Sequence, residues 1–175
     1  NWCVGNFQSR YLCIHAAVLE KNGFSVVLPA PPGSGKSTLC AMLMFAGWRL
    51  LSDEHCLIDP DDGLIIPCVR PISLKNKSIN VVNRLYPQVQ ICHITPDTHK
   101  GTIGYVAPSA LSWQQQSKKV NPFLVIFPRY QADQQQIKVE QLSQHQIFMQ
   151  LAENSFNYSV LGATGFETMA NLVNQ

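Results

Sequence analysis

Two apolar runs separated by a short polar turn are the first clear hydrophobic pattern along the chain. Residues 11–30, YLCIHAAVLEKNGFSVVLPA, are mostly apolar, and Asn22-Gly23 interrupts them. Asn-Gly between two apolar runs is a strong hairpin signal, because both residues tolerate the positive φ angles of a tight turn. The stretch therefore predicts two strands, and the second strand runs directly into a turn rich in proline and glycine.

A helical pattern follows that turn. In STLCAMLMFAGW the apolar residues Leu39, Met42, Leu43 and Ala46 fall on one stripe, and Gly47 is typical of a helix end. The next stretch, RLLSDEHCLIDPDDGLIIPC, predicts short strands broken by a turn at residues 60–63.

The remaining pattern is weaker. RPISLKNKSINVVNRLYPQ fits the end of a strand and then a short helix, and residues 92–121, with several prolines and glycines, predict loops. FLVIF at 123–127 predicts a buried strand, and a further strand is expected near residues 137–139. Two helices are expected around 143–153 and 162–173.

These elements predict one α/β domain with a mixed sheet and C-terminal helices. The length of 175 residues fits a single domain with a sizeable core. No internal linker divides the chain, and we expect residues 1–10 to be the remnant of a linker from a preceding region.

Composition and charge narrow the class of function. Charged residues make up 14% of the chain and the formal net charge is +2, so bulk electrostatics favour neither nucleic acid nor a membrane surface. We find no signal-peptide pattern and no apolar run of about 18 residues that could span a membrane. The six cysteines have wide, irregular spacings. We expect buried free thiols rather than a zinc site or disulfides, and hence a reducing, cytoplasmic location.

The most informative stretch is VVLPAPPGSGKST, at the end of the second predicted strand. It matches the phosphate-binding pattern G-x-x-x-x-G-K-[ST], with Ala30 in place of the first glycine. Its glycines let successive backbone N–H groups point inward, and the start of the next helix also favours a phosphate anion. We expect Lys36 to reach the β- and γ-phosphates and the Ser37 hydroxyl to bind Mg²⁺. The predicted nucleotide-binding residues are Ala30, Pro31, Pro32, Gly33, Ser34, Gly35, Lys36, Ser37 and Thr38.

Acidic residues lie in an unusual place for such a loop. Most nucleotide-hydrolysing enzymes of this class carry an Asp at the end of a second apolar strand. Here FLVIF ends in Pro128-Arg129, and the acids are Asp53 and Glu54, after the short apolar run RLL.

Taken together, these residues resemble the C-terminal catalytic domain of HPr kinase/phosphorylase, and more closely the bacterial HPr kinase-related proteins. That domain is similar in turn to the nucleotide-binding region of phosphoenolpyruvate carboxykinase. The resemblance is carried by His15, by the loop from Ala30 to Ser37 and by AGWRLLSDE, and it covers residues 11 to about 82.

The resemblance implies a single P-loop domain of the HPr kinase type that uses ATP and Mg²⁺ to phosphorylate a protein serine. By residue, it implies that Lys36 binds the phosphates, that Asp53 is the general base and that Glu54 helps to hold Mg²⁺. It also implies that His15 is an active-site histidine, and that the chain forms a homo-oligomer, since the family assembles into symmetric rings.

One part of the family pattern is absent. The family signature L-E-x-R-G-x-G is here LKNKSIN, residues 74–80, so Lys75 stands in place of a Glu that helps to bind Mg²⁺. A cation cannot ligate Mg²⁺, so the reverse reaction, phosphorolysis, is not expected. Lys75 could instead contact a phosphate or the acceptor. Arg70, Lys100 and Arg129 are further candidates to neutralise transition-state charge.

Three functions stay open from the sequence. The first is phosphoryl transfer to a protein hydroxyl. The second is nucleotide binding by a regulatory module without catalysis, which Lys75 and Ala30 favour. The third is a kinase of the same fold that acts on a small molecule.

Overall fold

The long strand β1 organises the larger of two sheets. The computed structural model describes residues 10–31, 33–132 and 134–174, so nearly all of the expected linker at 1–10 lies outside the described residues. The strands run in the order β5-β4-β1-β2-β9, and β3 also pairs with β1. Their bounds are β1 Leu12–Lys21, β2 Phe24–Pro29, β3 Arg49–Ser52, β4 His55–Ile58, β5 Ile65–Ile66 and β9 Leu124–Val125. The β2–β9 pairing is parallel and the others are antiparallel, so the sheet is mixed.

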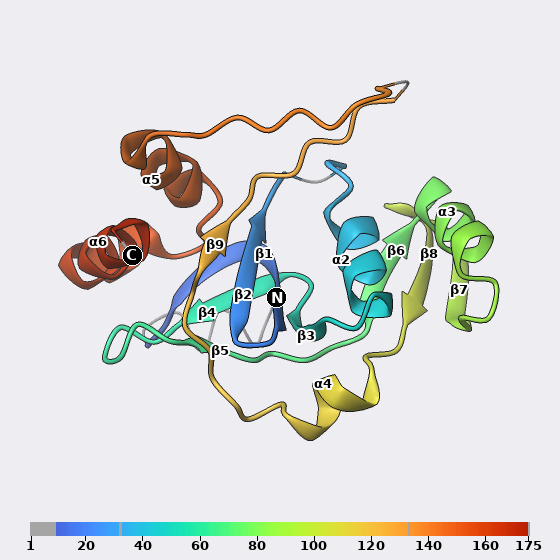
Figure 1. Cartoon of the computed structure of the whole chain (residues 1–175), viewed down its shortest axis with the longest axis horizontal. Coiled ribbons are helices and arrows are strands. Elements are labelled where there is room, and N and C mark those ends of the chain that lie inside the picture. The colour runs from blue at the N-terminus through green and yellow to red at the C-terminus, as the bar shows by residue number, and fades with distance from the viewer. Residues whose placement is uncertain (1–9, 32, 133, 175) are drawn as a thin grey trace.

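A second, three-stranded antiparallel sheet lies on the far side of a central helix (Figure 1). This sheet has the order β6-β8-β7, with β6 at Ile72–Lys75, β7 at Ile91–Thr98 and β8 at Gly101–Val106. The helix α2, Lys36–Phe45, packs between the two sheets, and α3, Lys77–Leu85, follows β6. Leu28, Met44 and Leu74 are buried together here and join β2, α2 and β6 into one core.

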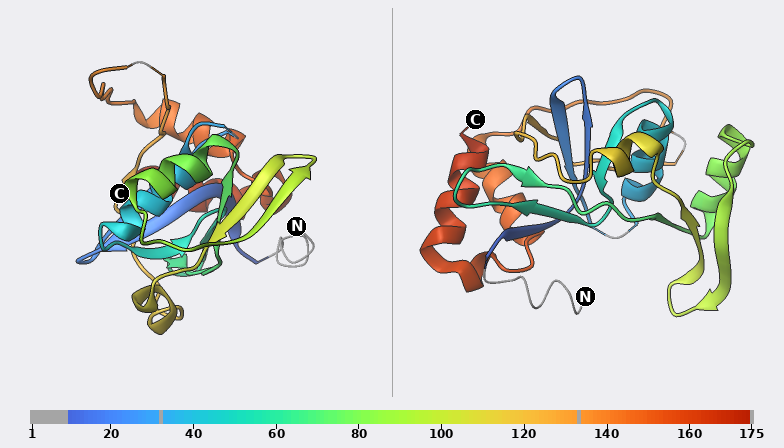
Figure 2. Two further views of the ribbon diagram at one scale, coloured as in Figure 1. Left: turned by 90° about the vertical axis from the view of Figure 1, so that its right-hand side faces the viewer. Right: turned by 90° about the horizontal axis from the view of Figure 1, so that it is seen from below.

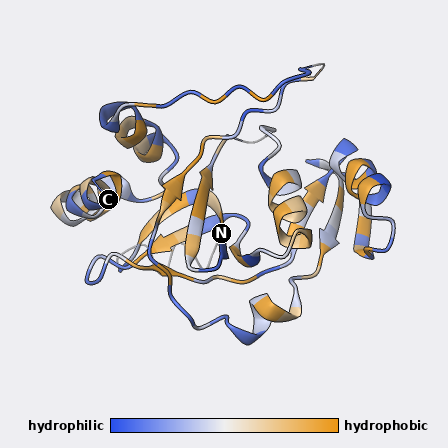
Figure 3. Ribbon diagram, viewed as in Figure 1, coloured by the Kyte–Doolittle hydropathy of each residue, from blue (hydrophilic) through white to orange (hydrophobic). Residues whose placement is uncertain are grey.

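The opposite face of the large sheet is covered by the last two helices, α5 at Gln144–Glu153 and α6 at Tyr158–Val173 (Figure 1). Ile14 and Leu51 from the sheet pack with Leu151 and Met169 from these helices in a second core. The short helix α4, Ala110–Gln114, lies outside these layers. The strands of the large sheet are the most hydrophobic part of the ribbon (Figure 3), as expected for a sheet covered on both faces.

The fold is therefore mixed α/β with C-terminal helices, as predicted. The hairpin at Asn22-Gly23, the helix after the glycine-rich turn and the strand-then-helix order of β6 and α3 are confirmed. The predicted helix start at 162 is a kink inside α6, because Gly162 has the non-helical angles φ 56° and ψ −126°.

Two element predictions are wrong, and a third, the strand in FLVIF, is confirmed only in part. Residues 92–121 are not mainly loops, because β7 and β8 form a hairpin that projects from the body (Figure 2). Register shifts along β7, with positive φ at His93 and Asp97, remove the alternation that would reveal a strand. In FLVIF only Leu124 and Val125 pair; this edge segment leaves Phe123 and Leu124 exposed. Residues 137–139 form no strand, and the side chains of Ile137 and Val139 are almost fully exposed.

Among the described residues, no helix has both the length and the apolar character that crossing a membrane requires.

Candidate functional site

The register of β1 places His15 beside the glycine-rich loop, residues 30–35. Ala16 pairs with Pro29, the last residue of β2, so His15 is level with the point where β2 passes into the loop. On its other side β1 pairs His15 with His55, the first residue of β4. The turn between β3 and β4 carries Asp53 and Glu54, so strand pairing alone brings the histidine, the loop and the acidic pair together.

The loop ends in a helix start of the kind that binds anions. Gly33 and Gly35 both have φ of 87°, a conformation that side chains with a Cβ avoid. Gly35 is the N-cap of α2, and its carbonyl accepts the hydrogen bond of Leu39 N–H. The N–H groups of the first turn have no helical acceptor and carry the positive end of the helix dipole. Pro32, one of the predicted binding residues, lies outside the described residues.

Lys36 is a buried cation that forms no ion pair among the described residues, although the charges of Asp53 and Glu54 act on it. Its side chain is 7% exposed, and its Nζ lies 2.9 Å from His15 Nε2. The ion pairs in the described part of the chain involve Arg49 and Lys119 instead. Burial, with a contribution from the Lys36 charge, lowers the pKa of His15 to about 4, so at neutral pH this ring is uncharged and accepts a hydrogen bond from the ammonium group.

Asp53 is almost completely buried next to the start of α2. Its Oδ2 accepts a hydrogen bond of 3.2 Å from Ser73 N, whereas its Oδ1 has no hydrogen-bond partner among the described residues. Burial raises the pKa of Asp53, and Lys36, Ser73 N–H and the Ser37 hydroxyl offset part of the rise. Ser37 is therefore close to the carboxylate, and the two side chains present oxygen atoms at one place.

The turn that carries the acidic pair is shaped by Ser52. Its hydroxyl accepts hydrogen bonds from Glu54 N, at 3.3 Å, and from His55 N, at 2.9 Å. This local bonding holds Asp53 inward and leaves Glu54 exposed.

Lys75 belongs to the same site. It ends β6, is half-buried and has no ion pair among the described residues. Burial is the largest cause of the lowered pKa values of His15 and Lys36, and the charge of Lys75 adds to both shifts. The charges of Lys75, Asp53 and Glu54 thus all act on Lys36 at the start of α2.

The other predicted cations lie further out. Arg70 is exposed and contributes, after burial and Glu54, to the pKa of His55, which is lowered overall. Arg129 is exposed and precedes Tyr130, whose backbone N–H donates to Ser34 O. Lys100 lies in the β7–β8 turn, where its carbonyl accepts a hydrogen bond from the Asn76 side chain. No interaction of the described residues joins Lys100 to the glycine-rich loop.

Two residues near the site were not predicted. Phe156, between α5 and α6, lies with its ring 5.6 Å from that of His15 and 5.7 Å from that of His55, and so walls one side of the histidine pair. Tyr130 contacts the glycine-rich loop itself. Neither residue stands in a sequence pattern that would have indicated the contact.

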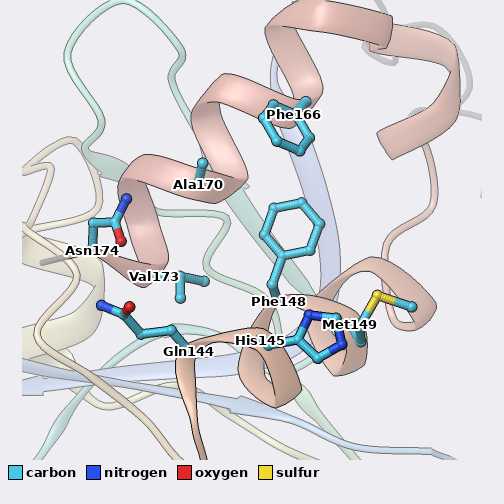
Figure 4. Close-up of a pocket in the computed structure, with 8 residues that line it drawn as sticks. All are labelled: Gln144, His145, Phe148, Met149, Phe166, Ala170, Val173 and Asn174. Atoms are coloured by element: carbon cyan, nitrogen blue, oxygen red, sulfur yellow. The ribbon is translucent and has the colours of Figure 1, made fainter.

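A hollow of about 370 Å³ lies elsewhere, between α5 and α6 (Figure 4). Its walls include Phe148 and Met149 of α5 and Phe166 of α6, all labelled in that view. None of the predicted site residues lines it, and it is therefore separate from the candidate site.

Comparisons with models of protein families, with curated proteins and with solved structures found no match for this chain.

Proposed function

We propose that the chain binds ATP through residues 30–38 and transfers its γ-phosphoryl group to a hydroxyl. The observation that carries the proposal is the buried Lys36 ammonium group at a helix start, which is held by a neutral histidine and has no ion-paired carboxylate among the described residues. A buried charge is costly unless an opposite charge or several hydrogen bonds compensate it. A phosphate group at the start of α2 would supply that compensation, and Lys36 would stabilise the charge that develops on the phosphoryl group.

The reaction needs few groups from the protein. The acceptor oxygen attacks the γ-phosphorus, the bond to the oxygen that bridges the β- and γ-phosphorus breaks, and the electron pair of that bond leaves with ADP. The acceptor proton passes to a carboxylate of the acidic pair. Lys75 would neutralise a further phosphate oxygen or an anionic group of the acceptor.

The roles within the acidic pair follow from burial. The family resemblance implies Asp53 as the base and Glu54 as the metal ligand, and we propose the reverse. Mg²⁺ takes oxygen ligands, and the Asp53 carboxylate, whose Oδ1 has no hydrogen-bond partner among the described residues, fits it together with the nearby Ser37 hydroxyl. When bound, the ion would neutralise phosphate charge. Glu54, exposed on the same turn, is the carboxylate that an acceptor hydroxyl can reach.

The protein serine as acceptor and the P-loop fold of the HPr kinase type remain part of the proposal. They are supported by the resemblance in residues 11–82 and by the meeting of His15, Lys36 and Asp53 at one edge of the sheet. Lys75 in place of the family Glu makes transfer in the reverse direction the less favoured reaction.

The first prediction tests binding. Lys36→Ala should weaken the affinity for ATP with Mg²⁺ by about 100-fold, because preorganised charged contacts of this kind are worth about 3 kcal/mol. Isothermal titration calorimetry measures the affinity, and Lys118→Ala, which removes an exposed lysine, serves as the control.

Transfer is tested separately, with γ-labelled ATP and a cell extract as the source of acceptors. Label that becomes covalently attached to a protein in the presence of the wild-type chain supports the kinase. Tight ATP binding without any transfer would favour the regulatory nucleotide-binding module. Unchanged ATP affinity in a folded Lys36→Ala variant would refute the phosphate site.

A further inference from the structure

The chain that follows β9 lies against the glycine-rich loop. β9 runs parallel to β2, with Val26 paired to Leu124 and Val27 to Val125, and Ile126 N donates to Val27 O at 2.9 Å. Because parallel strands reach the same edge of a sheet with their carboxyl ends, the residues after β9 arrive where β2 passes into the loop. Phe127 packs against the core and anchors this segment.

Tyr130 is fixed to the loop by its backbone. Its N–H donates to Ser34 O at 3.1 Å. Its Cβ lies 3.2 Å from the position that a Cβ on Gly35 would occupy, so the approach is closer than most residues at 35 would allow. The Tyr130 side chain is nevertheless 74% exposed. The backbone of Tyr130 is thus fixed at the loop that leads into α2, while its ring is mainly exposed.

An exposed tyrosine needs no explanation by itself, since many surfaces carry one. Tyr130 differs because its backbone contact places it at the loop, whereas the structure gives its ring little burial. The loop N–H groups and Lys36 can recognise only phosphates and do not recognise the sugar or the base of a nucleotide. An aromatic face offers the contact that the loop lacks, because every nucleobase has a π-face that can stack on it.

We propose that Tyr130 forms a wall of the nucleoside subsite and that its ring stacks on the base of the bound nucleotide. The inference rests on the proposed function, because it takes the triphosphate to occupy the glycine-rich loop. It adds a residue that selects nucleotides over phosphate chains that carry no base.

The experiment compares two ligands that share a triphosphate, ATP and inorganic tripolyphosphate, each with Mg²⁺. The wild-type chain should bind ATP more tightly than tripolyphosphate. Tyr130→Ala should weaken ATP binding by about 10-fold, within the range measured for base stacking on an aromatic ring, and leave the affinity for tripolyphosphate unchanged. Tyr130→Phe should retain the preference for ATP. Tyr105→Ala removes an exposed tyrosine from β8 in the other sheet and should change neither affinity.

The possible failures are distinct. If Tyr130→Ala binds both ligands as the wild type does, or loses affinity for both equally, the ring does not contact the base and the inference is wrong. If the wild-type chain binds neither ligand, the proposed phosphate site is itself wrong, and the nucleoside subsite falls with it.

Discussion

Lys36 and His15 illustrate how one contact prepares a side chain for an anion. A carboxylate partner would satisfy the buried ammonium group so well that a phosphate would have to compete with it. A neutral imidazole accepts one hydrogen bond, at 2.9 Å, and adds no negative charge. This arrangement requires the proton of His15 to be on Nδ1, which leaves Nε2 as the acceptor. His15 therefore holds Lys36 in place without neutralising it, and the charges of Asp53 and Glu54 act on the ammonium group without forming an ion pair with it in the described part of the chain.

The pKa of His15 gives a prediction for stability against pH. The unfolded state takes up a proton near pH 6.5, whereas the folded state takes it up only at about 4. Between these values the unfolded state binds more protons, so stability falls as the pH falls. Between pH 7 and pH 4.5 the melting temperature of His15→Gln should therefore fall less than that of the wild type. Thermal unfolding followed by circular dichroism at several pH values measures this slope.

His93→Gln, which replaces an exposed histidine on β7, is the matched control and should keep the wild-type slope. Part of the slope should remain in His15→Gln, because burial also lowers the pKa of His55. An equally steep slope in the wild type and in His15→Gln would show that His15 is not buried in its neutral form.

The two acidic residues should respond differently to Mg²⁺. If Asp53 holds the ion, the loss of transfer in Asp53→Asn should recover in part at high Mg²⁺. Glu54→Gln should cut transfer by about 10²–10⁴-fold at every Mg²⁺ concentration, the usual range for loss of a general base, and keep the ATP affinity within a few-fold. Titrating Mg²⁺ in the labelling assay separates the two. Recovery of Glu54→Gln alone would restore the roles that the family resemblance implies.

How far the sequence predicts this site depends on chain distance. The glycine-rich loop and Lys36 form a continuous motif, and the acidic pair ends the strand that follows α2, so both are readable from the sequence. Tyr130 is far along the chain from the loop and is joined to it by the short pairing of β2 with β9. A strand pairing of only two residues leaves no recognisable pattern in the sequence, so the contact of Tyr130 with the loop is seen only in the folded chain.

At the scale of elements, the β7–β8 turn is fastened to the start of α3 by Asn76. The Asn76 Oδ1 accepts a hydrogen bond from Thr102 N at 3.0 Å, and its Nδ2 donates to Lys100 O at 3.3 Å. Asn76 has φ of 51° and ψ of −123°, an unusual backbone conformation for a residue with a side chain. Because Asn76 follows Lys75, the hairpin helps to set the direction in which β6 delivers this lysine to the site.

Gly101→Ala should break this connection. The added Cβ would collide with the Asn76 side-chain amide, and φ at 101 is +82°. We expect the free energy of unfolding to fall by about 2–3 kcal/mol, of which about 1 kcal/mol reflects the left-handed backbone alone. Urea unfolding measures the change. Gly23→Ala is the matched control, since its φ is +87° but nothing lies within 4 Å of the new Cβ. Equal losses in the two variants would contradict a role for the Asn76 contact.

Elements were predictable where the pattern was both long and regular. The β1–β2 hairpin and α2 have continuous apolar runs that end at a clear turn, and the structure confirms them. β7 has mostly exposed side chains and an irregular register, so its strand conformation depends on pairing with β8 rather than on burial. The apolar character of Ile137 and Val139 suggests a strand, but hydrophobicity alone does not provide a partner strand. Both side chains are exposed and no strand forms there.

At the scale of the whole molecule, the C-terminal helices are joined to the strand that carries His15. Asn157, which precedes α6, accepts a hydrogen bond from Cys13 N at 2.9 Å and donates one to Tyr11 O at 2.8 Å. Phe156 N donates to Cys13 O, and His15 N donates to Asn154 O. The α5–α6 connection therefore extends the hydrogen bonding of β1, and the helices should unfold together with the sheet.

Asn157→Ala tests whether the C-terminal helices and the sheet unfold together. The change leaves the Cys13 N–H and the Tyr11 carbonyl without these partners, so the free energy of unfolding should fall by about 2 kcal/mol and the melting temperature by about 6 °C. Scanning calorimetry should still give one transition with equal calorimetric and van't Hoff enthalpies, because α5 and α6 share a core with β1. Asn171→Ala, at an exposed position of α6, should change the melting temperature by little. Two separate transitions would mean that the helices form a unit of their own, and the wall that Phe156 provides for His15 would then depend on a part of the chain that can detach.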